Sequence, residues 1–538
     1  MTDHLPATES RFDGNARCRV ADHSFAVLVY PFSFDRTRFD RLVVDVNGDA
    51  LDADDTTWTI WERRSFPQDD LLRHVADYLN PDSDVPPTAC LWTLEDRVLR
   101  SPHGLGLRPG SLALSLRHRR PANAAKETTG HAPDDAIALQ MDGIDLALFR
   151  VGIGYLMFRV RIPDGTAADW FDLLHGIRFI DRPGKVDLLL SRRTGKDRVE
   201  PFWPPLATAS DDAGSGRGTV GHLVGGLLGR VFPANTPGWR ELYVRGEMLP
   251  FHALFFEGVP ESEDALLLYR LRNFFRTAQP LHPSAEDLQP NQPALLPYAH
   301  RMWFSGTLEG GGFVAFDAPN TLFWSETMPE HLAEQYFLLF LLALHQRFAL
   351  MHLSEQVCEH WLGAEERVAE TRFASLREAL LEFTARGYFT QVMQREHHHR
   401  CFRAWRAIFE IESLFREVNE EVRELHGMLL MRKTERMHQL AEEQREFLAA
   451  RERVAQARAT RLGLWFSTIA ILLGFPSITI ALLQHLGVSS VETTLLSLGG
   501  SLLLGALLIA GIAAVAGRMT SRPDDDSTGR SQDSRNNP

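Results

Sequence analysis

The sequence has few of the features that mark secreted, metal-binding or nucleic-acid-binding proteins. Its 538 residues contain four scattered cysteines and no CxxC pair, which argues against a disulfide framework and a zinc-finger signature. The formal net charge is −13, whereas a nucleic-acid-binding surface is usually basic, so we expect no nucleic acid partner. The first residues are polar and contain no apolar signal segment, so nothing predicts secretion.

Catalytic signatures are also missing. The sequence has no GxSxG, no HExxH and no paired carboxylates at a known spacing, so we expect no enzyme and no cofactor. The glycine-rich segment 214–219 includes Arg217 but lacks the GxxxxGK[ST] spacing of a phosphate-binding loop. A flexible loop is therefore the favoured interpretation of this segment. The sequence leaves open whether the soluble part binds a small molecule or a cation.

One long stretch, residues 462–517, lacks both lysine and arginine. It contains two apolar runs, 462–483 and 493–517, and Glu492 is its only full charge. Each run is long enough to cross a bilayer as a helix, which takes roughly 20 residues. The segment between them, 484–492, has room only for a tight turn. The sequence therefore predicts an antiparallel transmembrane hairpin, with the lipid bilayer as a partner.

Charges beside the two runs predict their orientation. Arginines precede the first run and follow the second, whereas the connecting turn has none: Arg451, Arg453, Arg458 and Arg461 before, Arg518 and Arg522 after. Lysine and arginine accumulate on the cytoplasmic side of membranes. We therefore expect a multi-pass protein of the cell inner membrane with both termini in the cytoplasm.

The part before residue 326 shows mixed α and β patterns. We expect an α+β or α/β cytoplasmic domain at 21–325, with a division into two lobes near residue 210 as one interpretation. Strands are predicted at 25–30, 112–116, 156–162 and 186–190. The period-two pattern of 156–162 predicts one buried and one solvent-facing side. The terminal segments 1–20 and 518–538 are predicted to be disordered.

Proline is absent from 330 to 475, which favours long helices. We predict a helical pair at 326–389, then a stalk helix at 390–461 that continues without a break into the first span. The apolar run 337–344 is too short to cross a membrane, so it predicts a buried helix.

Apolar residues of the stalk recur in steps of three and four. They are Cys401, Ala404, Ile408, Ile411, Phe415, Val418, Val422, Leu425 and Leu429. Such a heptad seam is typical of a helix that packs against copies of itself, or here against the preceding helix of the pair. The seam weakens beyond Leu429. We therefore expect a homo-oligomer with the seam as its interface.

This order of parts resembles the CorA family of divalent-cation transporters. The resemblance implies a funnel-shaped homopentamer in which stalk helices line a vestibule and the first span lines the pore. The family carries a Gly-Met-Asn motif at the outer end of the first span, where this chain has Leu486-Gly487-Val488-Ser489. Since the family motif binds hydrated magnesium, its loss predicts a pore that is not magnesium-selective.

Candidate site residues follow from these parts. Hydroxyl side chains of the first span are candidates for the pore lining, or else bond back to their own helix: Ser467, Thr468, Ser477 and Thr479. Glu492 and Ser489 would lie at the outer mouth, where a ring of carboxylates attracts cations. Glu492 has an alternative interpretation as a helix-start charge. His397 and Cys401, four residues apart on a helix, are weak metal-ligand candidates.

These features favour an oligomeric inner-membrane ion channel or transporter that is gated by its cytoplasmic domain. Two alternatives remain open. One is a nucleotide-responsive membrane effector of a bacterial defence system, and the other is a membrane tether that conducts nothing.

Overall fold

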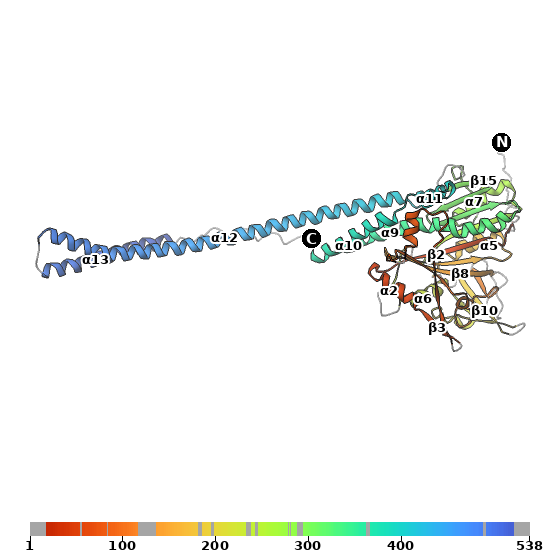
Figure 1. Ribbon diagram of the computed structural model, residues 1–538, viewed down its shortest axis with the longest axis horizontal. Coiled ribbons are helices and arrows are strands. Elements are labelled where there is room, and N and C mark those ends of the chain that lie inside the picture. Colours follow the sequence, from red (N-terminus) through yellow and green to blue (C-terminus); the bar gives the residue numbers. More distant parts are fainter. Residues whose placement is uncertain are drawn as a thin grey trace, which may run out of the picture. The chain divides into compact units, whose positions relative to one another are not determined.

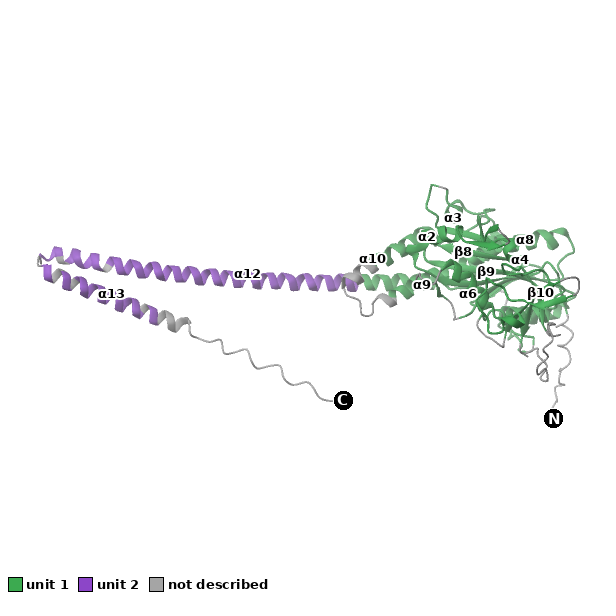
Figure 2. Ribbon diagram, turned by 90° about the horizontal axis from the view of Figure 1, so that it is seen from below, with its two compact units in different colours: residues 1–426 green, residues 427–538 purple. Residues whose placement is uncertain are grey.

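The computed structural model describes residues 18–53, 56–82, 84–116, 136–180, 186–194, 198–232, 238–242, 246–277, 279, 281–287, 294–361, 366–487 and 491–520. They belong to two compact units, residues 1–426 and residues 427–538, which are coloured separately in Figure 2. Apart from 18–20 and 518–520, the terminal segments predicted to be disordered lie outside the described residues.

Residues 1–426 are built around one large sheet (Figure 1). Its main path, in spatial order, is β11 (Arg198–Pro201), β10 (Val186–Thr194), β7 (Leu112–Leu116), β8 (Ile137–Phe149), β9 (Ile153–Arg161), β2 (Phe25–Ser33), β14 (Leu249–Glu257), β17 (Gly310–Phe316), β16 (Met302–Thr307) and β15 (Leu295–Ala299). Shorter strands join this path: β1 (Arg19–Val20) pairs with β14, β13 (Arg240–Glu241) with β2, β12 (Arg217–Gly218) with β10, and β5 (Trp61–Arg64) and β6 (Ala89–Leu94) extend from β8. A separate hairpin pairs β3 (Ala50–Ala53) with β4 (Thr56–Thr59). Among the described pairs of the sheet, β14 with β17 is parallel and the others are antiparallel, so the fold is of the α+β kind.

Helices cover both faces of this sheet. One face is covered by α2 (Phe39–Asn47), α4 (Asp96–Arg100), α5 (Ala167–Gly176), α6 (Val220–Val231) and α7 (Asp264–Arg272), which together with the sheet enclose the first core. The other face is covered by α3 (Arg73–Leu79), α8 (Met328–His331), α9 (Phe337–Trp361), α10 (Glu366–Glu382), α11 (Glu396–Ile408) and the beginning of α12 (Ile411–His485), which enclose the second core.

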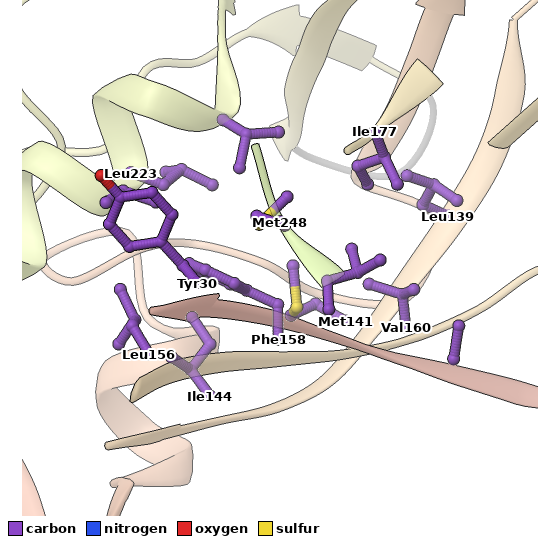
Figure 3. Close-up of a cluster of buried hydrophobic side chains, with 14 of the residues drawn as sticks. Tyr30, Leu139, Met141, Ile144, Leu156, Phe158, Val160, Ile177, Leu223 and Met248 are labelled. Atoms are coloured by element: carbon purple, nitrogen blue, oxygen red, sulfur yellow. The ribbon is translucent and has the colours of Figure 1, made fainter. Parts of the chain in front are cut away.

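Strand β2 shows how the sheet serves both cores. Alternate side chains of a strand point to opposite faces, and accordingly Leu28 and Tyr30 lie in the first core while Val27 and Val29 lie in the second. Figure 3 shows a portion of the first core, in which Tyr30 from β2 and Phe158 from β9 lie beside Leu223 from α6. Strands buried on both faces are apolar at nearly every position, as β2 is.

The second helix layer corrects the expectation of one solvent-facing side for 156–162. In β9 the predicted buried side chains do lie in the first core, but the opposite face is also buried, because Tyr155 and Met157 lie in the second core. Arg159 and Arg161 are part-exposed at the end of the strand, where Arg161 binds Asp142 with two nitrogens. Strands from both sides of the predicted division near residue 210, β2 and β14 for example, pair within one sheet.

The predicted helical pair consists of two long helical segments. The first includes the π-helical turns η5 (Phe323–Thr327) and η6 (Leu332–Tyr336) around α8 and then continues as α9. The second is α10, which ends in a third π-helical turn, η7 (Phe383–Gly387). Residues 338–344 of α9 are buried in the second core, in agreement with a buried helix.

The stalk is not one unbroken helix from residue 390. Residues 390–395 are not helical, α11 occupies Glu396–Ile408, and a break at Phe409 and Glu410 precedes α12. Glu410 has a φ of 53°, a left-handed conformation that interrupts helical hydrogen bonding. From Ile411 the helix is continuous for 75 residues, through Gly427 and Pro476, to His485.

A candidate membrane hairpin and its helical base

Two helical stretches of the described chain are long and apolar enough to cross a membrane, and their burial distinguishes them. In Phe323–Val357, 83% of the most apolar window is buried, so this is an interior helix of residues 1–426. In Ile411–Leu482 none of that window is buried. The predicted first span, 462–483, lies at the C-terminal end of this second stretch.

Large apolar side chains of this span are exposed. Trp465, Leu473 and Ile478 have exposed fractions of 71%, 67% and 65%. Soluble monomeric proteins rarely expose contiguous apolar surface beyond a few hundred Å². The described side chains of 462–483 therefore require either lipid or other protein chains to cover them.

Helix α13 (Val491–Thr520) contributes a second exposed apolar surface. It runs back alongside the end of α12, so residues 427–538 end in a helical hairpin (Figures 1 and 2). Leu496, Leu503 and Leu507 have exposed fractions of 77%, 66% and 66%, whereas the small side chain of Ser501 is buried. Small residues allow helices to approach closely in lipid, so the side of α13 around Ser501 suits a helix contact.

A glycine ends the first helix of the hairpin. Gly487 has a φ of 71°, the left-handed conformation that commonly follows a helix C-terminus. This explains why the glycine occurs between Leu486 and Val488, where the resembled family has its motif. Ser489 and Val488 lie outside the described residues. Glu492 lies in the first turn of α13, where a negative charge is stabilised by the helix dipole.

Hydroxyl groups of the first span bond to their own helix. Thr468, Ser477 and Thr479 donate to backbone carbonyl oxygens three or four residues earlier, at 2.6, 2.9 and 3.0 Å. Ser467 is exposed on the same segment. A hydroxyl that donates to a carbonyl keeps its lone pairs, so these oxygens remain available as weak ligands for a cation.

The predicted seam is largely buried within the chain. Cys401, Ile411, Val418 and Val422 are buried in the second core, and Ile408, Phe415 and Leu425 pack against it. Polar contacts also fix the beginning of α12, since Ser354 of α9 donates to Glu421 at 2.9 Å. Of the two interpretations of the seam, packing within the chain accounts for residues 401–425, while Leu429 is part-exposed beyond them.

A second row of apolar residues on α12 was missed at the sequence level. Met437, Leu440, Phe447 and Val454 have exposed fractions of 62%, 49%, 68% and 54% and follow one another at steps of three, seven and seven. These steps keep the side chains on one side of the helix. The surrounding charged residues obscured the pattern. We call these four residues the exposed row.

The candidate metal ligands His397 and Cys401 lie one turn apart on α11. Within the described ranges no group of three or more His, Cys, Asp or Glu side chains is placed to hold an ion. Cys401 is 1% exposed, and burial raises the pKa of its thiol well above the usual value. The ring of His397 lies 4.2 Å from that of His398, whose pKa burial lowers to about 4.

The glycine-rich segment 214–219 is a packed turn. Gly216 is left-handed with a φ of 65°, and a side chain at Gly218 would collide with the ring of Trp203. Thr219 caps α6 together with His222, which accepts from the Thr219 backbone N–H at 3.0 Å. These contacts explain Gly216 and Gly218 without a phosphate.

Comparison with family models, with curated proteins and with solved structures finds no match for this chain. Its function therefore has to be inferred from the residues and the geometry described above.

Proposed function

We propose that this protein is an oligomeric inner-membrane ion channel or transporter, gated by its cytoplasmic domain at residues 1–426. The observation that carries the proposal is the exposed apolar hairpin formed by the end of α12 and by α13. Its two apolar runs match the thickness of a bilayer and contain no lysine or arginine. The arginines outside both runs favour termini on the cytoplasmic side.

Self-association is supported by the exposed row on α12. Four large apolar side chains along one side of an otherwise solvated helix are a surface that copies of the same helix can cover. In such an assembly the row would drive contact between copies, whereas residues 401–425 would stay packed within each chain. The pentamer expected from the resemblance to CorA proteins is part of this proposal.

Conduction would involve weak oxygen ligands. The first span offers the hydroxyls of Ser467, Thr468, Ser477 and Thr479, and the mouth offers Glu492. Magnesium releases its waters reluctantly and needs well-placed oxygen ligands for the hydrated ion. Because no asparagine motif follows the first span, we propose that the pore is not magnesium-selective.

Ion flux into proteoliposomes of purified full-length protein tests this function. We expect monovalent cations to be conducted at least as readily as magnesium. We expect Glu492→Gln to lower cation flux or to shift selectivity toward anions, because it removes the charge that concentrates cations at the mouth. Magnesium uptake that resists sodium and potassium, and is indifferent to Glu492→Gln, would contradict the proposed selectivity. An absence of flux from inserted, oligomeric protein would favour the non-conducting tether.

A further inference from the structure

A small cavity lies where three distant parts of residues 1–426 meet. Three guanidinium groups and one carboxylate line it: Arg36, Arg150, Arg386 and Glu382. Arg36 begins the 3₁₀ turn η1 (Arg36–Arg38) after β2, Arg150 lies in the turn between β8 and β9, and Arg386 belongs to η7. The lining therefore carries a formal excess of two positive charges.

Arg150 is held rigidly in this wall. Its Nε donates to the carbonyl oxygen of Pro87 at 2.9 Å, and both of its terminal nitrogens donate to the carboxylate of Asp40, at 3.0 and 2.5 Å. An arginine has five N–H donors, so two remain for another acceptor. These two N–H groups lie on opposite edges of the guanidinium plane, so Arg150 offers a single fixed donor, not a donor pair, to any one acceptor.

The other two arginines are weakly engaged. Arg36 forms a long ion pair with Glu378, at 3.8 Å, in which the side chain of Arg36 is 23% exposed and that of Glu378 is 76% exposed. Exposed pairs of this kind contribute little. Arg386 is exposed and takes part in none of the ion pairs between described residues. Both guanidinium groups can therefore engage an incoming anion at little cost.

One residue of the cavity lining contacts a buried histidine. Tyr78 lines the cavity, and its hydroxyl lies 2.9 Å from Nε2 of His345, which is fully buried. Burial lowers the pKa of His345 to about 3, so this histidine is neutral. Its Nδ1 and the buried hydroxyl of Tyr155 have no hydrogen-bond partner within the described part of the chain.

An open groove adjoins the cavity and shares Glu382 and Arg386 with it. Phe373 of α10 and His426 of α12 line this groove, with nearly parallel rings 5.9 Å apart. The cavity has a volume of about 20 Å³, so it can take only a single small polar group, whereas the groove offers apolar and aromatic surface for a larger body attached to that group.

We propose that this cavity binds the phosphate group of a small phosphorylated molecule. Arg36 and Arg386 would be its main ligands and Arg150 a fixed third. A phosphate monoester carries roughly −1.5 to −2 charges at pH 7, so it would pair mainly with Arg36 and Arg386, because Asp40 already balances the charge of Arg150. Guanidinium groups also bind phosphate oxygens in pairs, with charge-assisted hydrogen bonds.

The position of Arg386 connects this site to α12. Two residues later, Tyr388 stacks on Phe415 of α12 with ring centres 4.2 Å apart, and its hydroxyl accepts from Arg406 at 2.9 Å. Gln346 holds the same segment by donating to the carbonyl oxygens of Gly387 and Phe389. A ligand that reorders η7 therefore acts on the beginning of α12. This regulatory consequence rests on the proposed function, whereas the binding itself does not.

Isothermal titration of full-length protein in detergent micelles at low salt tests the site, with pyrophosphate and ATP as probes. We expect saturable binding of at least one probe, weakened by about tenfold or more in the double variant Arg36→Gln with Arg386→Gln. Arg386→Lys keeps the charge but loses the planar pair of donors, so an intermediate loss is expected. Arg193→Gln, on an exposed position of β10, is the matched control and should bind like the wild type.

The two probes distinguish the sources of the phosphate. Equal affinities would assign the site to a free oxyanion, and tighter ATP binding that Phe373→Ala reduces would assign it to a phosphate group with a body in the groove. Unchanged binding in the double variant, or no heat from either probe at millimolar concentration, would overturn the proposal. Since titration needs no membrane insertion or flux, loss of transport with intact binding would overturn the proposed function alone.

Discussion

Two arginines placed in the middle of the first apolar run should prevent the protein from integrating into a membrane. Leu472 and Leu473 of α12 are 45% and 67% exposed, and they lie near the centre of 462–483. An arginine at the centre of a spanning helix costs about 2.5–3.5 kcal/mol on insertion scales. The pair therefore costs about 6 kcal/mol, a factor of about ten thousand in the partition between inserted and uninserted chain, at about 1.4 kcal/mol per factor of ten.

If the hairpin were instead exposed to water, the same two substitutions would have a much smaller energetic effect. Exposed surface substitutions usually change stability by no more than about 0.5 kcal/mol each, so Leu472→Arg with Leu473→Arg would then be nearly silent. A matched control is available on the same helix. Leu430 and Met431 are 52% and 66% exposed and lie outside the apolar run, so Leu430→Arg with Met431→Arg should leave integration unchanged.

The assay is alkaline carbonate extraction of membranes from cells that express each variant, followed by detection of the protein. We expect the wild type and the control pair to stay in the membrane pellet and the central pair to be extracted. Reporter fusions at Pro538 and at Val488 then give the topology, with a cytoplasmic signal expected for Pro538. The reasoning is refuted if the wild type itself is extracted, or if the central pair resists extraction as well as the control does.

Three further outcomes are expected. Val418→Asp should lower the midpoint of thermal unfolding by several degrees, because it places an unpaired charge in the second core, where Val418 is 1% exposed; an unchanged midpoint would contradict the packing of the seam within the chain. Phe447→Asp should leave that midpoint unchanged but reduce the oligomer seen by cross-linking and native mass measurement, because Phe447 belongs to the exposed row; intact oligomers would mean that the row is not an interface. His252 is fully buried, and burial lowers its pKa to about 3, so it is neutral in both states above about pH 6.5. Below that pH the unfolded chain takes up a proton that the folded chain does not, and the free energy of unfolding falls by up to about 1.4 kcal/mol per pH unit until the folded pKa is reached. His252→Leu should flatten this loss in urea unfolding between pH 7 and pH 5, and an identical slope in both proteins would refute this assignment.

The sequence predicts a strand well where its apolar and polar residues alternate because one face of the strand is buried in a core. The even positions of 156–162 do lie in the first core, as their period of two indicates. The burial of Met157 could not be predicted in the same way, because it depends on helices at 323–426 that cover the opposite face of the sheet. A helical pattern in the sequence does not specify which surface the helix covers.

The break before α12 has a related origin. Neither glycine nor proline occurs at 409–410, and Glu410 adopts a left-handed conformation that is uncommon for a residue with a side chain. The seam continues across the break, since both Cys401 and Ile411 lie in the second core. Tertiary packing therefore sets the break, and the heptad pattern alone predicts an unbroken helix.

The arginines of the cavity were not recognisable in the sequence for a different reason. Arg36, Arg150 and Arg386 are separated by more than 100 residues, and each has the appearance of an ordinary surface charge. The sheet brings the first two together, because β2 and β9 are neighbours and the turn before β9 carries Arg150. Arg386 joins them because it belongs to η7, the turn at the end of α10, and α10 packs in the second core.

The two roles of α12 depend on different stretches of the same helix. Residues 411–425 are packed into the second core, so their positions respond to changes in that core, as the stack of Tyr388 on Phe415 illustrates. Helix α12 extends from Ile411 to His485 and includes Pro476, which cannot donate a helical hydrogen bond, whereas the break at Glu410 separates α11 from α12. A change at η7 reaches α12 through the stack of Tyr388 on Phe415, and it reaches α11 through the hydrogen bond from Arg406 to Tyr388. In the proposed channel this makes Phe415 the first residue through which a ligand in the arginine-lined cavity would influence the membrane hairpin.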